Sequence, residues 1–67
     1  MEEIVFLVKE SEEGGYEAKA LEISIFTEGE TIQELKNNIK EAVQLHFDDT
    51  NKRIARLHFL KEEIFAI

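Results

Sequence analysis

The chain has 67 residues, a net charge of -7 and no cysteine. A domain of this length buries only about 60% of the surface that its unfolded chain exposes, and no disulfide or cysteine-ligated metal can reinforce so small a core. The negative charge disfavours direct binding to nucleic-acid phosphates. We therefore expect residues 1–67 to form one domain that gains stability as a homodimer. The lack of cysteine is typical of a reducing cytoplasm, where we place the protein.

A first strand is predicted over residues 4–9. Its apolar run, Ile-Val-Phe-Leu-Val, occupies both faces, which is typical of a central strand. The run is too short to span a bilayer and follows two glutamates, so we expect neither a signal peptide nor a membrane anchor. Residues 11–15 end in two glycines and predict a hairpin turn.

Two further strands are predicted before the first helix. Residues 16–20 alternate between apolar and charged side chains, with the tyrosine and both alanines on one face. Small alanine side chains allow a helix to approach that face closely. A bend is expected at residues 21–22, and the β-branched and aromatic residues 23–27 predict the third strand.

An amphipathic helix follows the third strand. Thr31 and Glu34 have the spacing of a capping box, in which the threonine oxygen accepts from a first-turn amide and the glutamate reaches back. We expect the helix to end near Phe47, because the carboxylates of Asp48 and Asp49 are unfavourable at a helix C-terminus. Apolar side chains at spacings of three and four define its buried face. They are Ile32, Leu35, Ile39, Ala42, Val43 and His46 with Phe47.

A final strand is predicted over about residues 53–61, and residues 62–67 either extend it after a break or are loosely held. Short turns make the first three strands an antiparallel meander. A helix of about 24 Å can return the chain through a right-handed crossover, so that the last strand lies beside the first. The expected fold class is α+β, with strand order 3-2-1-4 and the helix on one face.

Three segments resemble the HicB-type antitoxin family, and the resemblance extends over almost the whole chain. The segments are Tyr16-Glu17-Ala18, Thr27-Glu28-Gly29-Glu30-Thr31-Ile32-Gln33-Glu34 and Asn38-Ile39-Lys40-Glu41-Ala42. The resemblance implies a partial ribonuclease-H-like fold. It also implies a stand-alone domain that binds and blocks a small basic HicA-like toxin, which is an mRNA-cleaving ribonuclease with a fold like that of double-stranded-RNA-binding domains.

The chain departs from that family's pattern in two places. The family usually carries a Pro-Gly loop between its second and third strands, where this chain has Leu-Glu-Ile-Ser at residues 21–24. Many members also carry a C-terminal DNA-binding domain, whereas the residues that follow the helix here suffice only for a strand and a tail. We therefore expect no direct nucleic-acid binding and no promoter recognition.

No pattern in the chain predicts catalysis. Two-metal nuclease chemistry needs converging carboxylates, and a ribonuclease-H fold would place one in the first strand, which has none at residues 4–8. His46, Asp48 and Asp49 straddle the helix end without a second cluster to complete a metal shell. His58 has no serine or cysteine nucleophile placed beside it. We expect no enzyme activity, no catalytic or metal-ligating residue and no cofactor.

Two interaction surfaces are predicted instead. An acidic hairpin tip can contact a basic partner, and we assign Glu12, Glu13, Tyr16 and Glu22 to partner binding. One helix covers only one face of the sheet, so one face of the first strand points outward. The outward side chains are either Ile4, Phe6 and Val8 or Val5 and Leu7. An exposed apolar face of this kind marks an interface. We assign to a dimer interface Val5, Leu7, Phe26, Arg56 and His58.

Two functions are consistent with these surfaces. The first is an antitoxin module that occludes a basic ribonuclease toxin. The alternative is a small dimeric scaffold or regulatory interaction domain without a toxin partner. A neighbouring short gene for a basic protein would separate the two.

Overall fold

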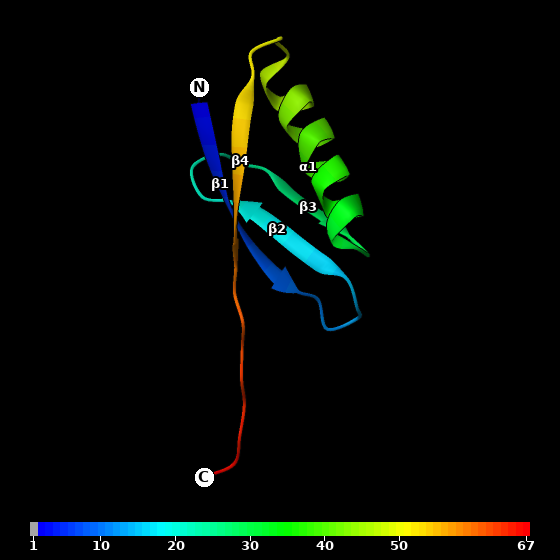
Figure 1. The fold of residues 1–67 in the computed structure, drawn as a ribbon, viewed down its shortest axis with the longest axis vertical. Coiled ribbons are helices and arrows are strands. Elements are labelled where there is room, and N and C mark those ends of the chain that lie inside the picture. Colours follow the sequence, from blue (N-terminus) through cyan, green and yellow to red (C-terminus); the bar gives the residue numbers. More distant parts are fainter. Residues whose placement is uncertain (1) are drawn as a thin grey trace.

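The computed structural model describes residues 2–67 as a four-stranded sheet with one helix packed on one face (Figure 1). The strand order is β3-β2-β1-β4. The first three strands are antiparallel neighbours, and β4 is parallel to β1. These findings confirm the predicted α+β class and strand order. The elements are β1 (Glu2–Glu10), β2 (Tyr16–Ala20), β3 (Phe26–Gly29), α1 (Ile32–Phe47) and β4 (Arg53–Phe59).

The core lies between α1 and the sheet. Ile4, Phe6 and Val8 of β1 are buried beneath the helix, so Val5 and Leu7 point to the opposite face. Ala18 and Ala20 of β2 are buried on the same side as Phe6, as their alternation predicts. Leu35 and Ile39 of α1 complete the buried cluster.

The β1–β2 hairpin has the expected turn. Ser11 donates its N–H to the carbonyl of Gly15 and accepts from the N–H of Gly14, both at 3.0 Å. Gly14 and Gly15 have φ angles of 99° and 80°, in the region that side chains disfavour. The two glycines therefore suit the turn because of its backbone geometry.

The third strand lies later in the chain than predicted. It begins at Phe26 instead of residue 23, because the segment before it is a turn. The N–H of Ile25 donates to the carbonyl of Ile23 at 2.9 Å, and the N–H of Ala20 donates to the carbonyl of Ile25 at 3.0 Å. Ile25 is buried and Ile23 packs against the core. The two isoleucines close one end of the core, which accounts for their apolar character. The strand prediction was wrong here because it attributed that apolar character to strand pairing.

The helix begins and ends where its sequence predicts. Thr31 Oγ1 accepts from the N–H of Glu34 at 3.0 Å. The Glu34 carboxylate accepts from the N–H of Glu30 at 3.3 Å, one residue before the cap itself. At the other end, Asp48 adopts a left-handed conformation with φ 49° and donates its N–H to the carbonyl of Gln44. Both ends thus satisfy backbone groups that helix termini leave open.

Residues that carry the family resemblance hold α1 against β3. A Cβ atom added to Gly29 would lie 2.6 Å from the backbone nitrogen of Leu35, so only glycine allows this close approach. Asn38 Nδ2 donates to the carbonyl of Glu28 at 2.7 Å and ties the second turn of the helix to the strand. Gly29 and Asn38, which belong to the segments that resemble the HicB family, therefore have a structural role in this fold.

The chain after β4 leaves the body of the molecule. β4 ends at Phe59, two residues earlier than predicted, and the N–H of Leu60 still donates to the carbonyl of Val8 at 2.8 Å. Residues 61–67 then run outward in an extended path and are exposed (Figure 1). We call residues 60–67 the tail.

Candidate protein-interaction site

The open face is the side of the sheet opposite α1. Adjacent strands bring side chains into register there. Phe26 of β3 lies opposite Lys19 of β2, Lys19 opposite Leu7 of β1, and Leu7 opposite His58 of β4. Val5 lies opposite Arg56 in the next row. The structure thus brings together on one face all five residues assigned to the dimer interface, whose role in association stays a prediction.

Ile54 belongs to the same face, and sequence reasoning missed it. It lies opposite Glu3 and is 47% exposed. Its alternation with Arg56 and His58 along β4 is the signal that would have found it. Phe26 is 60% exposed, so the two ends of the face each present a large apolar side chain to solvent.

An ion pair crosses the open face beside Val5. Arg56 Nε donates to the Glu3 carboxylate. This hydrogen bond and the guanidinium charge lower the pKa of the Glu3 carboxyl, and the same contact raises the pKa of Arg56. The pair thus links side chains of β1 and β4 on a side of the sheet that no helix covers.

The acidic end is the second surface. It comprises the hairpin tip and the adjoining ends of β1, β2 and β3. Glu12 and Glu13 lie exposed at the tip, whereas Tyr16 packs against the core from the helix side. The fourth residue assigned to partner binding, Glu22, lies past the far end of β2, about 17 Å away along a five-residue strand. The structure therefore places Glu22 apart from the other three.

Two more carboxylates extend the acidic end onto the open face. Glu17 and Glu28 lie directly opposite each other on neighbouring strands, an arrangement of like charges that is unfavourable. Lys9 Nζ approaches Glu17 at 4.0 Å from the other side. The register of β2 and β3, which the sequence pattern did not predict, creates this pair.

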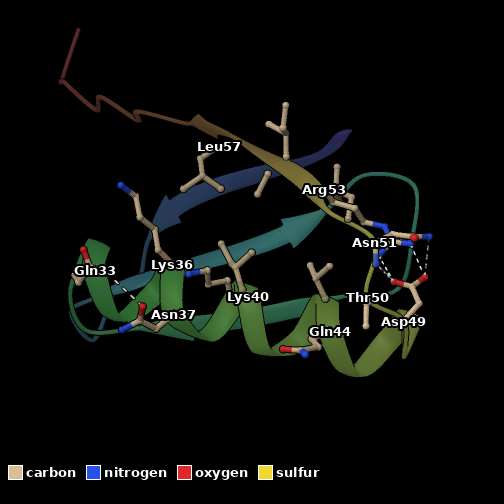
Figure 2. Close-up of a pocket in the computed structure, with 15 residues that line it drawn as sticks. Gln33, Lys36, Asn37, Lys40, Gln44, Asp49, Thr50, Asn51, Arg53 and Leu57 are labelled. Carbon is tan, nitrogen blue, oxygen red and sulfur yellow. Dashed lines mark hydrogen bonds and ion pairs between the residues drawn. The ribbon is translucent and has the colours of Figure 1, made fainter. Parts of the chain in front are cut away.

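A groove of about 530 Å³ separates α1 from β4 (Figure 2). The helix packs over β2 and β3 and leaves the helix-side face of β4 uncovered. Lys36 and Lys40 stand on the helix rim, while Ala55 and Leu57 line the strand side. Sequence reasoning did not predict this groove, because helix periodicity shows which side of a helix is buried and not where the helix crosses the sheet.

Arg53 closes one end of the groove. Its two terminal nitrogens donate to both carboxylate oxygens of Asp49 at 2.9 Å, and its guanidinium carbon lies 3.7 Å from the centre of the Phe47 ring. The Arg53 Nε is buried without a hydrogen bond, 3.4 Å from a Glu2 carboxylate oxygen. The guanidinium lowers the pKa of the Asp49 carboxyl and its own pKa is raised. Arg53 thereby fastens the helix end to the start of β4.

The three residues weighed as metal ligands have other partners. Asp49 binds Arg53, Asp48 caps the helix, and the His46 ring meets the Phe47 ring edge-on at 4.9 Å. Within residues 2–67, no group of three potential ligand side chains is close enough to hold a metal ion. Across that same range, the single helix lacks the length and apolarity to cross a membrane.

This architecture defines a small α+β domain whose notable exposed features are an open sheet face of mixed apolar and charged side chains, an acidic end and a groove. The chain is similar to a UPF0150 protein of Thermotoga maritima, with 45% identity over 65 residues that cover 97% of this chain and 93% of that protein. It is also similar to a UPF0150 protein of Archaeoglobus fulgidus, with 46% identity over 46 residues, 69% of this chain and 68% of that protein. The chain belongs to the UPF0150 family. No family model and no solved structure matches it.

The two ion pairs predict how stability depends on pH. The pKa values of Glu3 and Asp49 are lowered in the folded chain from ordinary values of 4.5 and 3.8. The unfolded chain therefore takes up these protons first on acidification. The contribution of both pairs is complete above the ordinary values and is lost as pH falls through the lowered ones.

We expect the urea midpoint to fall between about pH 6 and pH 3. The double variant Glu3→Gln/Asp49→Asn should show a shallower fall, because it removes the two linked protonations. Glu41→Gln is the matched control, since Glu41 is exposed and forms neither pair. Equal slopes for the wild type and the double variant would contradict this prediction.

Proposed function

We propose that this protein is a HicB-like antitoxin module, which binds a small basic mRNA-cleaving toxin and covers the surface that the toxin uses on RNA. The observation that carries the proposal is the acidic end, where Glu12 and Glu13 at the hairpin tip are joined by Glu17 and Glu28 on the open face. Support also comes from the fold, which has the strand order that the HicB resemblance implies. The proposal places the protein in the cytoplasm, where its target would act.

The mechanism of inhibition is occlusion. The negative field of the acidic end steers a basic protein toward this side of the sheet and raises the association rate. Contact with a cationic side chain relieves the repulsion between Glu17 and Glu28. Phe26, which is 60% exposed, and the half-buried Val5 and Leu7 then supply apolar area for the bound state. Because inhibition needs only coverage of the toxin, the antitoxin requires no reacting group of its own.

Co-expression tests the proposal directly. We expect a short neighbouring gene to encode a basic protein that arrests growth when it is expressed alone. Co-expression of this chain should restore growth, and the two proteins should co-purify. A basic neighbour that forms no complex and whose toxicity is not relieved would overturn the antitoxin proposal.

Charge reversal locates the contact. Glu12→Lys and Glu13→Lys should each slow association several-fold and reduce its dependence on salt, because rim charges act mainly on the association rate. Glu41→Lys makes the same change in net charge on the exposed side of α1 and should leave the rate nearly unchanged. Equal effects at all three positions would show that net charge matters and that the hairpin tip is not in the contact.

A dimeric scaffold or regulatory domain without a toxin is the second candidate. The observation that favours it is the exposed apolar tail, which provides a surface for self-association. A stable dimer with no basic protein encoded nearby would support this function over the first.

A further inference from the structure

β4 and the tail form one extended segment, and the outer edge of β4 has no neighbouring strand. β4 is the last strand of the sheet and pairs with β1 alone. The tail continues in the same direction, away from the rest of the molecule (Figure 1). Large apolar side chains on it are exposed, with Ile64 at 85% and Phe65 at 78%. An unpaired strand edge that continues into an exposed, apolar, extended segment is a template for pairing with another strand.

We infer that a second copy of this chain covers this edge. In the dimer, β4 and the tail of one subunit pair antiparallel with the same segment of the other, so that each tail runs along the partner's β4. The eight residues of the tail are sufficient to cover the seven residues of β4. A two-fold axis makes the contact self-complementary.

Charge selects the antiparallel direction. β4 carries Arg53, Arg56 and His58 and no carboxylate, whereas the tail carries Glu62 and Glu63 with one lysine. Antiparallel pairing sets the basic strand against the acidic tail. Parallel pairing in register would set Arg56 against the same residue of the partner, which is unfavourable, and would leave each tail in contact only with the other tail.

Side-chain matching selects one register. Pairing centred on Phe59 places Arg56 opposite the partner subunit's Glu62, and Ile54 opposite the partner subunit's Ile64. Phe59, which is 55% exposed in the single chain, meets the partner's Phe59 at the axis. A shift by two residues breaks the first two matches. A shift by one residue sets side chains of opposite faces against each other.

The same register extends the strand side of the α1–β4 groove, because the partner's tail lies next to β4 in the plane of the sheet. The partner's Glu63 comes to lie beside Ala55 on the helix side of the sheet, facing the rim that holds Lys36 and Lys40. The partner's Phe65 lies beside Arg53 at the closed end of the groove. The open face with Val5, Leu7 and Phe26 stays free. This inference is independent of the antitoxin proposal, because the only partner is a second copy.

Disulfide trapping tests the register. The chain has no cysteine, so in the double variant Ile54→Cys/Ile64→Cys only the two introduced cysteines can form disulfides. Within one chain these positions are about 33 Å apart along an extended segment, far beyond the roughly 7 Å limit between bridged Cα atoms. We expect mild oxidation to yield mainly a covalent dimer. The control Ile54→Cys/Ala66→Cys places its cysteines opposite each other only if the register is shifted by two residues. It should yield at least about tenfold less covalent dimer. Equal yields, or no dimer from the first variant, would overturn the register.

Sedimentation of the full chain tests the interface. The wild type should be a dimer at micromolar concentration, and Ile64→Asp/Phe65→Asp should raise the dissociation constant at least about a hundredfold. Both positions are exposed in the single chain, so the variant retains its fold. Phe26→Asp, at the β3 end of the alternative interface on the open face, should leave the constant unchanged. A monomeric wild type, or dissociation by Phe26→Asp and not by the tail variant, would overturn the inference.

Discussion

Replacing Gly29 by alanine is expected to destabilise the folded chain by about 2–3 kcal/mol, a typical cost of overpacking a tight contact. The added Cβ would lie 2.6 Å from the backbone nitrogen and 2.9 Å from the Cα of Leu35, and 3.1 Å from the carbonyl carbon of Glu34. Every one of these atoms is backbone. Relief of the clash therefore requires α1 to move away from β3 as a unit, which weakens the packing of Leu35 in the core.

Urea unfolding followed by circular dichroism measures this loss. Thr31→Ala is the matched control, because it lies two residues away and removes only the helix cap, at a cost of about 1 kcal/mol. Any Gly29→Ala protein that remains folded should bind partners as the wild type does, since the position is buried. A smaller loss for Gly29→Ala than for Thr31→Ala would mean that the helix and strand approach each other less closely than the structure indicates.

Phe6→Ala should unfold the chain. Truncation of a fully buried phenylalanine costs about 3–5 kcal/mol, through lost burial and the cavity that remains, and Phe6 is 0% exposed at the centre of the core. A domain of this size has a total stability of only about 3–10 kcal/mol. The far-ultraviolet circular dichroism of the variant at room temperature should show a large loss of ordered structure.

The matched control is the same substitution on the other side of the sheet. Phe26→Ala removes a ring that is 60% exposed, so it should change stability by about 0.5 kcal/mol or less. The contrast separates a core phenylalanine from one that is available to a partner. If both variants lost equal stability, the open face would be as important to the fold as the core.

Local sequence signals predicted the helix and the second strand well, because each depends on neighbours in the chain. The cap at Thr31 and Glu34 and the end at Phe47 follow from backbone groups that only nearby side chains can satisfy. The alternation at residues 16–20 has a period that fits only a strand with one buried face. Short turns and one crossover then left few possible strand orders.

The third strand shows where local signals become ambiguous. Ile23 and Ile25 have the composition of a strand, but they close the end of the core from a turn. Burial and strand pairing both select apolar β-branched residues, so composition cannot separate them. The distinction depends on which backbone groups find partners, which is a property of the folded chain.

The sequence by itself determined the fold class, the helix with its cap and the amphipathic patterns that build the core. Only the tertiary structure decided that Phe6 faces the helix and Leu7 faces outward, because an apolar run carries no period. Strand register likewise decided that Glu17 lies opposite Glu28. The position at which the helix crosses the sheet decided the ion pair between Arg53 and Asp49 and the groove beside β4. Contacts between distant segments fix those quantities, and no local pattern encodes them.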